Sequence, residues 1–410
     1  MVAHDVAVIG GGVVGTAIAK HLVETSDLDV CVVEKEYRLG AHQSGRNSGV
    51  IHPGFSYEPG TLQARQATKG ARMLKSYCRD NGVPVNEDGI LVTAQNETEY
   101  ERLRALHQNG QENGVETELV DDESEIRSYE PNATGIAALY CPEGGSVDFM
   151  KYLYTLAKDA ENGGVQYYMG YEVEDVYERS DNHVLTTSKG DIEASYVINA
   201  AGLYADTIAK GMGVNSSYQI VPFRGVYYEL TPDSAETVRS NIYPTPDPDY
   251  TSVGIHFTRR TDGKVIVGPN VALSLGREAY DISESSLSEL LETLRYRGFW
   301  NLIRSPKSLL VAKDELSKSY SKRLFVEAAQ ELVPNVRPEE FVDSYTGIVA
   351  KLVRDDGELV NEQVYLHGER STHILYVIPG LTSSMAIGEY IAEEVIERLD
   401  ATELSDPAAA

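Results

Sequence analysis

The segment DVAVIGGGVVGTAIAKHLVETSDLDVCVVE, residues 5–34, decides the fold of this chain. Its first six residues are nearly all apolar, as in a parallel strand buried on both faces, and a glycine cluster follows them. Apolar residues then recur at helical spacing, at Val14, Ala17, Ile18 and Leu22. A second apolar strand runs from Val30 to Val33. This strand–helix–strand unit predicts one mononucleotide-binding half of a doubly wound α/β sheet.

The glycine cluster matches the G-x-G-x-x-G pattern of dinucleotide-binding folds. We expect Gly10 to make the tight turn, Gly12 to let a diphosphate approach the backbone, and Gly15 to pack the helix against the strand. Glu34 ends the second strand, where it is placed to accept both hydroxyls of a ribose. Its charge would repel a 2′-phosphate, which disfavours NADP. The alternative is a simple glycine turn, but the surrounding strands and Glu34 favour dinucleotide binding.

Two downstream segments indicate which dinucleotide binds. Residues 38–50, which include LGAHQSGRNSGV (39–50), form a loop rich in glycine and serine directly after the second strand. Its amides and hydroxyls are suited to line a pyrophosphate and a flavin ring, although an ordinary surface loop is the alternative. The segment VINAAG (197–202) is an apolar strand that ends in small residues, which leaves room for a cofactor to pass close by.

Five longer blocks resemble the D-amino-acid-oxidase-like family of FAD enzymes, and within it the L-2-hydroxyglutarate oxidase/dehydrogenase branch. They are HQSGRNSGVIHPGFSYEPGTLQA (42–64), VPFRGVYYEL (221–230), IYPTPDPDY (242–250), GIHFTRRTDGKVIVGPN (254–270) and GREAY (276–280). The resemblance implies a bound FAD, no metal, and oxidation of a small 2-hydroxy acid by hydride transfer to flavin N5. Other small anionic alcohols (glycerol 3-phosphate, lactate), amino acids, or a role as a flavin-bound redox subunit are the alternatives.

The resemblance implies an α/β protein in which a Rossmann-like FAD domain is interleaved with an antiparallel-sheet α+β substrate domain. We expect the FAD domain to take residues 1–80, 146–215 and 340–400, and the substrate domain 81–145 and 216–339. The expected cofactor residues are Gly10, Gly12, Gly15, Glu34, Lys35, His42, Ser44, Gly45, Arg46, Asn47, Ser48, Val173, Ala201, Gly202, Gly380 and Thr382.

Oxidation of a secondary alcohol requires a base for the hydroxyl proton and cations for the carboxylates. His52 and His256 lie in the matched blocks and are the candidate bases, although a structural histidine is the common alternative. Arg224 lies between apolar residues, so a role as a solvated surface residue explains it poorly. It is therefore the candidate catalytic residue that anchors a substrate carboxylate. Further candidates for the substrate site are Arg259, Arg277, Lys351 and Tyr250, with Lys264 as another available cation.

The carboxyl-terminal third departs from the family pattern. Family members usually carry an arginine shortly after a Gly-Ile or Gly-Val pair, whereas here Gly347-Ile348 is followed by Val349. This substitution removes an expected carboxylate-binding group. The approach to the last helix also differs, because it reads VIPGLTS (377–383).

Composition excludes several classes of protein. The chain has 63 acidic and 36 basic residues and a formal net charge of −27, which disfavours nucleic-acid binding. Three cysteines without paired spacing argue against disulfides and a zinc site. No apolar run approaches the roughly 18–20 residues of a membrane span, and no signal peptide is recognisable. We therefore expect a cytoplasmic protein. The resemblance implies an enzyme that passes electrons to oxygen or to a membrane quinone, the latter at the cytoplasmic face of a membrane.

The acidic residues are dispersed and only 14 residues are lysine, a pattern that suggests adaptation to high salt, with an ordinary acidic protein as the alternative. Counterions would screen the mutual repulsion of the carboxylates. The melting temperature is therefore expected to be higher in molar KCl than at low ionic strength. An unchanged or lower value in KCl would refute salt adaptation.

Apolar periodicity predicts the remaining elements. We expect helices over 62–79, 97–109, 150–162 and 386–399, helical spacing over 284–303, and strands over 90–95, 194–200, 217–230 and 374–378. Residues 165–192 are predicted to form a three-stranded meander, and 254–268 a hairpin that turns at Asp262-Gly263.

Overall fold

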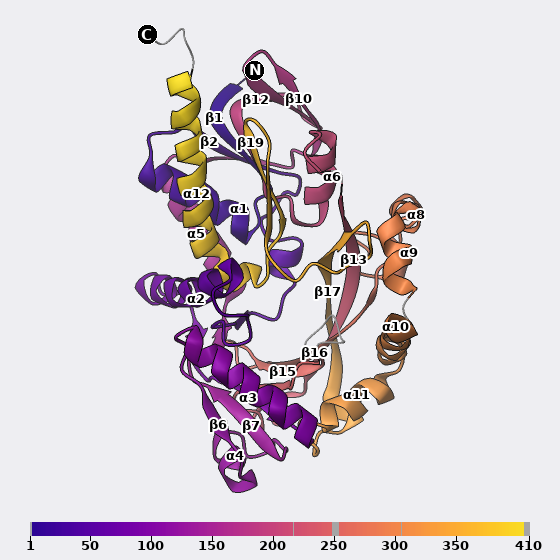
Figure 1. The fold of residues 1–410 in the computed structure, drawn as a ribbon. Helices are drawn as coiled ribbons and strands as arrows, with labels where there is room; N and C mark the ends of the chain where they lie inside the picture. The colour runs from indigo at the N-terminus through magenta and orange to yellow at the C-terminus, as the bar shows by residue number, and fades with distance from the viewer. Residues whose placement is uncertain (1, 216, 248–253, 305, 406–410) are drawn as a thin grey trace.

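The computed structural model describes residues 2–215, 217–247, 254–304 and 306–405. The chain forms two large sheets at opposite ends of the molecule (Figure 1). The first sheet lies at the end that also holds the carboxyl-terminal part of the last helix, α12 (Gly380–Ser405). The first sheet has the order β10-β11-β12-β1-β2-β9, and β19 pairs with β12 and β18. Its strands are β1 (Val2–Ile9), β2 (Val30–Glu34), β9 (Gln166–Met169), β10 (Val173–Arg179), β11 (Asn182–Thr187), β12 (Ile192–Asn199), β18 (Val364–His367) and β19 (Ser371–Tyr376).

The central strands of the first sheet are parallel and buried on both faces, as their apolar sequences predict. Val6 and Val8 of β1 pack against α1 (Val13–Thr25) and α12 (Gly380–Ser405). The alternate residues, Ala7 and Ile9, face an apolar cluster that includes Ile208 of α6 (Ala205–Gly211). The predicted strand–helix–strand unit is therefore confirmed.

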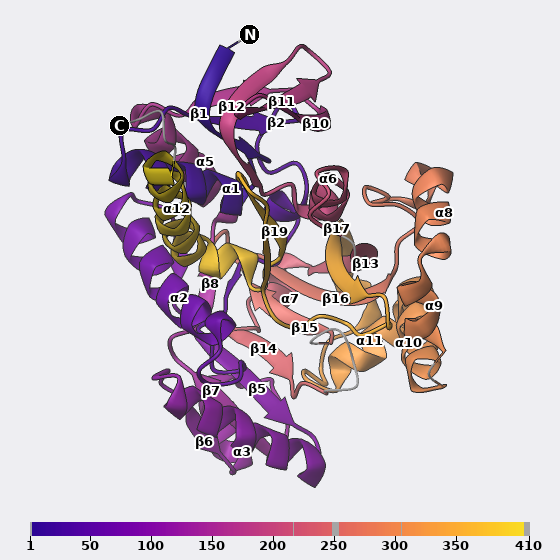
Figure 2. The same ribbon diagram turned by 45° about the horizontal axis from the view of Figure 1, so that its top comes forward.

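The second sheet is mainly antiparallel and has the order β17-β13-β16-β15-β14-β5-β7-β6. Helices α8 to α11 lie along one side of it (Figure 2), and Phe325 of α11 belongs to its buried core. The strands are β5 (Ile90–Ala94), β6 (Glu118–Val120), β7 (Ala137–Cys141), β13 (Tyr218–Leu230), β14 (Asn241–Pro244), β15 (His256–Arg259), β16 (Val265–Leu273) and β17 (Phe341–Arg354). The helices are α8 (Leu287–Arg295), α9 (Arg297–Ile303), α10 (Pro306–Tyr320) and α11 (Lys322–Gln330).

A small third sheet has the order β3-β8-β4. Its strand β3 directly precedes His52 in the sequence. It consists of β3 (Val50–Ile51), β4 (Val85–Asn86) and β8 (Gly145–Val147). The remaining helices are α2 (Leu62–Asp80), α3 (Glu97–Glu112), α4 (Glu123–Tyr129), α5 (Phe149–Asn162) and α7 (Pro232–Ala235), with short 3₁₀ turns η1 (Gln43–Gly45), η2 (Gly202–Tyr204), η3 (Ile282–Glu284) and η4 (Pro338–Glu340). Among the described residues, no helix has the length and apolar character that crossing a membrane requires.

The predicted α/β fold class is confirmed, and so is the hairpin at Asp262-Gly263, because β15 and β16 pair as antiparallel neighbours. The meander over 165–192 is wrong. After helix α5, Gln166–Met169 returns as a parallel neighbour of β2, while β10, β11 and β12 form the antiparallel run. The helical stretch 284–303 is two helices, because the backbone of Tyr296 is extended between α8 and α9.

The division into two interleaved domains stays our proposal. Strands from 81–145 and 216–339 do share the second sheet, as that division expects. However, β17 comes from the range 340–400 and pairs along β13 in the second sheet. We therefore propose that residues 341–354 go with the second domain, and that the first domain resumes with β18.

Candidate functional site

A cavity of about 440 Å³ lies where the strands of the first sheet end. Its wall includes the glycine turn at 10–12, the loop 40–44, the segment 200–204 after β12, and the beginning of α12. Val349 and Ala350 of β17 bring the second sheet to the same cavity. The crevice beyond the carboxyl ends of parallel strands is where open α/β sheets bind ligands.

The three motif glycines have the geometry that the sequence predicts. Gly10 has a φ of +104°, and a Cβ on it would lie 2.5 Å from the carbonyl oxygen of Ala200. A Cβ on Gly15 would lie 2.1 Å from the carbonyl oxygen of Gly10, so only glycine allows this helix–strand approach. Gly12 lines the cavity and is the N-cap of α1, where it offers no side-chain cap. The Val13 amide of α1 donates to Ser44, whereas the amides of Val14 and Gly15 have no hydrogen bond among the described residues and are therefore available to an anionic ligand.

Glu34 and Ser44 hold the glycine turn in place. The Glu34 carboxylate accepts hydrogen bonds from the amides of Gly11 (2.7 Å) and Glu36 (2.9 Å). Burial raises the pKa of Glu34, and these two amides oppose that rise. The Ser44 hydroxyl accepts a hydrogen bond of 2.9 Å from the amide of Val13. Both side chains line the cavity, where their remaining lone pairs and the serine hydroxyl hydrogen can meet a ligand.

Most of the predicted cofactor residues line the cavity. They are Gly10, Gly12, Glu34, Lys35, His42, Ser44, Asn47, Val173, Ala201, Gly202 and Gly380. Gly15, Gly45, Arg46, Ser48 and Thr382 are not in its wall. Gly45 instead allows a close approach to the Gly40 carbonyl oxygen, 1.9 Å from where a Cβ would lie. The Arg46 guanidinium lies over the ring of Tyr280 at 3.9 Å, so a direct cofactor contact is not supported for it.

Thr382 connects the start of α12 to the segment that carries His52. Its buried hydroxyl donates to the carbonyl oxygen of Val50 (3.3 Å) and accepts from the amide of His52 (3.1 Å). Gly380 and Leu381, which directly precede Thr382, line the cavity. This pair of hydrogen bonds therefore fixes His52 close to the cavity wall.

His52 and His256 are brought together, as the sequence predicts for two residues of one site. Tyr243 lies between them, edge-on to His52 (6.2 Å between ring centroids) and stacked on His256 (4.1 Å). Burial lowers the pKa of each histidine to about 4. The neighbouring His52 further lowers the pKa of His256, because two nearby positive charges would repel each other. Both rings are therefore neutral at physiological pH.

The two histidines differ in access. His256 is buried, its Nδ1 lies 2.9 Å from the carbonyl oxygen of Gly254, and its Nε2 has no hydrogen-bond partner among the described residues. Because a carbonyl can only accept, Nδ1 carries the proton and Nε2 presents a lone pair. His52 is half-buried, and no hydrogen bond to its ring occurs within the described part of the chain. His52 is thus the histidine that a small molecule reaches more readily.

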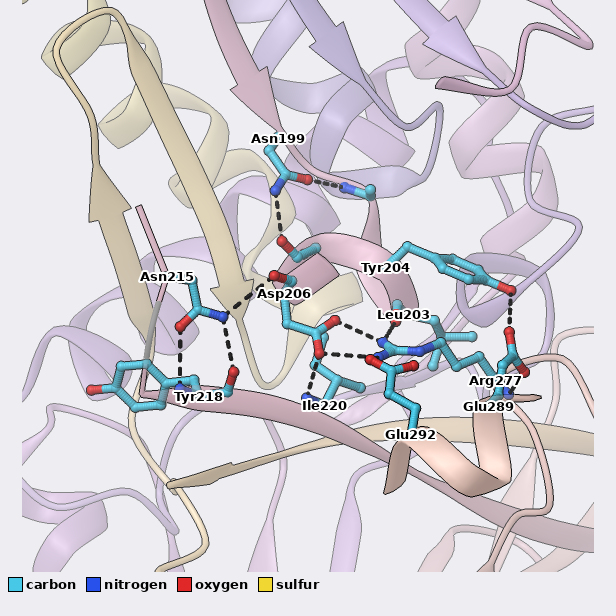
Figure 3. Close-up of polar contacts among 12 residues, drawn as sticks. Asn199, Leu203, Tyr204, Asp206, Asn215, Tyr218, Ile220, Arg277, Glu289 and Glu292 are labelled. Atoms are coloured by element: carbon cyan, nitrogen blue, oxygen red, sulfur yellow. Dashed lines mark hydrogen bonds and ion pairs between the residues drawn. The ribbon is translucent and has the colours of Figure 1, made fainter. Parts of the chain in front are cut away.

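Arg277 is a correction to the predicted substrate site. Its guanidinium makes a bidentate ion pair with Asp206 of α6, with N–O distances of 2.7 and 3.1 Å (Figure 3). The side chains of Arg277 and Asp206 are 3% and 4% exposed. Glu292 adds a third contact at 3.2 Å. A buried guanidinium engaged in this way is not available to a substrate carboxylate.

The other predicted cations also have defined places. Arg259 donates to the carbonyl oxygen of Val238 (2.7 Å) and lies 3.5 Å from Asp88, so it is turned toward the protein. Lys264 pairs with Glu229 at 3.1 Å. Lys351 lies opposite Val221, on the face of the sheet that packs against Phe299 of α9, and burial lowers its pKa to about 8. A substrate contact is not supported for these three residues.

Arg224 is different from these cations. It is half-buried, and within the described part of the chain it makes no hydrogen bond or ion pair, although its charge helps to lower the pKa of Asp281. It lies opposite Ile348, and Ile348 belongs to the apolar cluster that contains Leu203 and Tyr376 of the cavity wall. Arg224 therefore lies on the face of β13 that this cluster covers. Tyr250, the remaining predicted substrate residue, lies outside the described residues.

Several site residues were missed from the sequence. Tyr243 separates the histidines, and Tyr345 stacks on Tyr227 and donates a hydrogen bond of 2.5 Å to the Asn47 carbonyl in the cavity wall. Tyr376 is part of the cavity wall itself. Among 26 tyrosines, sequence spacing carries no signal for these contacts. The matched block IYPTPDPDY did contain Tyr243, which was the signal available.

Residues 5–394 match the family model described as FAD dependent oxidoreductase. The chain belongs to this family. Among curated relatives, the L-2-hydroxyglutarate dehydrogenase of Escherichia coli (strain K12) is 33% identical over 96% of this chain and 93% of its own length. The mitochondrial L-2-hydroxyglutarate dehydrogenases of Nematostella vectensis and Homo sapiens are 35% and 33% identical, over 96% and 97% of this chain and 91% and 89% of theirs.

Solved structures of two oxidases share the fold. The L-α-glycerophosphate oxidase of Mycoplasma pneumoniae, solved with FAD bound, superposes with a TM-score of 0.78 at 22% identity, covering 98% of this chain and 95% of that one. The glycine oxidase of Geobacillus kaustophilus gives a TM-score of 0.72 at 21% identity, covering 97% and 95%. At these identities the comparison establishes the fold alone.

Family membership makes FAD the cofactor, and the cavity fits it. Gly12 lines the cavity, and because glycine has no side chain a dinucleotide can approach the backbone there. The amides of Val14 and Gly15 at the start of α1 are suited to a diphosphate, and Glu34 at the end of β2 is suited to a ribose. The predicted enzyme class and cofactor are thus confirmed: the chain is an FAD-dependent oxidoreductase.

Proposed function

We propose that this enzyme oxidises L-2-hydroxyglutarate to 2-oxoglutarate. The observation that carries the proposal is similarity along nearly the whole chain, at 33–35% identity, to L-2-hydroxyglutarate dehydrogenases of bacteria and animals. Similarity of this extent includes the second sheet and the histidine segments as well as the cofactor domain. Anaerobic mixing with a panel of hydroxy acids and amino acids tests the proposal, because only a true substrate reduces the bound flavin.

In this proposal His52 takes the proton of the substrate hydroxyl. It is the half-buried member of the histidine pair, and its low pKa of about 4 keeps the ring neutral and able to accept a proton. The bound FAD would supply the hydride acceptor at flavin N5. Removing the hydroxyl proton while the C2 hydrogen leaves as hydride gives the ketone of 2-oxoglutarate.

We propose that His256 and Tyr243 position His52. The hydrogen bond from Nδ1 of His256 to the Gly254 carbonyl fixes the His256 ring. Tyr243 stacks on this ring and contacts the His52 ring edge-on, so the packing also restricts the orientation of His52. Buried rings in contact lose rotamer freedom, which favours one productive orientation of the base. Nε2 of His256 has no hydrogen-bond partner in the described part of the chain, so it is a second candidate acceptor for the substrate hydroxyl.

Arg224 is our candidate for a carboxylate anchor, because no hydrogen bond or ion pair engages its guanidinium among the described residues, and its charge interacts only at longer range with Asp281. It lies opposite Ile348, which packs in the apolar cluster next to the cavity. The strand pairing along β16 places Arg224 at a distance from His256. Arg224 pairs with Ala272 and His256 with Gly268, a separation of four residues, or about 13 Å along a strand. An extended arginine side chain spans part of that distance, and the substrate would span the rest. Val349 provides no charge at the position of the family's usual arginine.

Arg224→Ala is expected to raise the KM for L-2-hydroxyglutarate by roughly 10–100-fold, because a bidentate charged hydrogen-bond pair is lost. We expect kcat to fall less than KM rises, so that kcat/KM changes mainly through KM. Arg259→Ala is the matched control, since Arg259 lies in the same sheet but is turned toward Val238 and Asp88. Equal KM values in Arg224→Ala and the wild type would exclude Arg224 as the anchor.

Several finer features are proposals of the same kind. We propose oxygen or a membrane quinone as the electron acceptor, and a cytoplasmic location, with contact to the membrane face if a quinone is used. A second candidate substrate class is another small anionic alcohol or an amino acid, which Val349 in place of the family's arginine favours. Flavin reduction by substrate in the isolated chain separates all of these from a redox subunit that requires a partner.

A further inference from the structure

The segment 276–280, Gly-Arg-Glu-Ala-Tyr, follows β16 and makes polar contacts with three separate parts of the first domain. Its first anchor is Arg277, which binds Asp206 of α6 and donates to the carbonyl oxygen of Leu203 (Figure 3). Leu203 lines the cofactor cavity. The anchor is buried, so it ties the segment firmly to the η2–α6 side of the cavity.

The second anchor is Glu278, which pairs with the ammonium group of Lys35. Lys35 directly follows β2 and Glu34, lines the cavity, and lies 4.7 Å over the ring of Tyr204, another residue of the cavity wall. Glu36 also faces this ammonium group at 3.8 Å. Lys35 thus supplies the positive charge for two carboxylates that come from the two sides of the contact.

The third anchor is Tyr280. Its hydroxyl lies 2.7 Å from Nδ1 of His42, and the Arg46 guanidinium covers its ring at 3.9 Å. Nε2 of His42 is bonded in turn to Glu36 at 3.0 Å, so both ring nitrogens are engaged. His42 lines the cavity, and Arg46 belongs to the same loop. Tyr280 therefore fixes the loop that follows β2.

We propose that segment 276–280 is a clasp that retains FAD. It connects the end of β2, the loop 40–46 and the η2–α6 turn, all of which form or adjoin the cavity wall, to the chain that directly follows β16 of the second sheet. FAD then dissociates only when the outer contacts at Glu278 and Tyr280 open. The proposal goes beyond the oxidation reaction, since it concerns the kinetics of cofactor binding and holds whichever substrate the enzyme takes.

The outer contacts allow a test that leaves the core intact. Arg277 is unsuitable, because removing one partner of a buried ion pair leaves an uncompensated charge that endangers folding. Glu278→Gln, Tyr280→Phe and the double variant keep side-chain size. Glu229→Gln is the matched control: Glu229 also pairs with a lysine, Lys264, and is similarly exposed (26% against 33% for Glu278), but lies in the second sheet and outside the cavity wall.

The measurement is the rate at which free-FAD fluorescence appears after dilution of each holoenzyme. We expect release about 3–10-fold faster in each single variant and about 10–50-fold faster in the double variant, and an unchanged rate in Glu229→Gln. The difference in melting temperature between holoenzyme and apoenzyme should shrink in the double variant. Wild-type release in the double variant would overturn the proposal, and so would an equal fall in both melting temperatures, which would mean a purely structural contact.

Discussion

Replacing His52 with alanine is expected to slow anaerobic flavin reduction by L-2-hydroxyglutarate by roughly 10²–10⁴-fold, with little change in substrate binding. The reason is that His52 is half-buried, neutral and bonded to Thr382 at the start of α12, next to the cavity, whereas the nearby His256 is enclosed. Stopped-flow reduction of variants with full flavin content measures the effect. His52→Gln should be similarly slow, because glutamine retains polarity but is not a base.

The pH dependence identifies the base. A base acts only when unprotonated, so kcat/KM for the wild type should fall as the pH drops through about 4, the pKa that burial gives His52, and this group should cause no loss between pH 5 and 8. His256→Ala is expected to slow reduction about 10-fold through loss of positioning while keeping that low-pH limb. His107→Ala, a half-buried histidine hydrogen-bonded to Thr117, is the control. Wild-type rates in both His52 and His256 variants would refute the assignment.

Gly12→Val is expected to yield a folded but colourless protein, with FAD affinity lower by roughly 10²–10⁴-fold. A side chain at the N-cap of α1 would occupy the cavity wall and keep the diphosphate from about two backbone amides, each worth roughly 1.5–3 kcal/mol as a charged hydrogen bond. The fold tolerates the change, because the atom nearest to the new Cβ is the flexible Ser44 hydroxyl at 3.0 Å. Flavin absorbance per chain and circular dichroism measure the two outcomes.

Gly15→Val provides the contrast to Gly12→Val. Its Cβ would lie 2.1 Å from the backbone oxygen of Gly10, which cannot move without separating α1 from β1. We therefore expect Gly15→Val to lose the fold together with the flavin. A yellow Gly12→Val protein with normal FAD content would contradict the assigned role of the glycine turn.

The cofactor half of the molecule was predictable from the sequence because its determinants are local. Gly10, Gly15 and Glu34 act within one strand–helix–strand unit, so spacing along the chain is equivalent to position in space. The second sheet was less predictable. Its strand β17 pairs with β13, more than a hundred residues away, and α10 and α11 follow from packing against that sheet. Gln166–Met169 was misassigned because its partner, β2, is equally remote in the chain.

The candidate site shows the same limit. His52 and His256 were identified as residue types suited to proton transfer, but their meeting at Tyr243 depends on contacts between two sheets. Arg277 was misjudged because charge alone does not reveal a buried partner, and Asp206 is 71 residues away in the chain. The same contact turned a predicted substrate ligand into one anchor of the 276–280 segment.

The substrate assignment is tested by anaerobic single-turnover mixing of the FAD-loaded enzyme with the separate enantiomers of 2-hydroxyglutarate. We expect the L enantiomer to bleach the flavin and to yield one 2-oxoglutarate per FAD, while the D enantiomer leaves the flavin oxidised. Amino acids should also leave it oxidised. Bleaching by amino acids, together with no reduction by L-2-hydroxyglutarate, would contradict the account and make the amine-oxidase alternative the function.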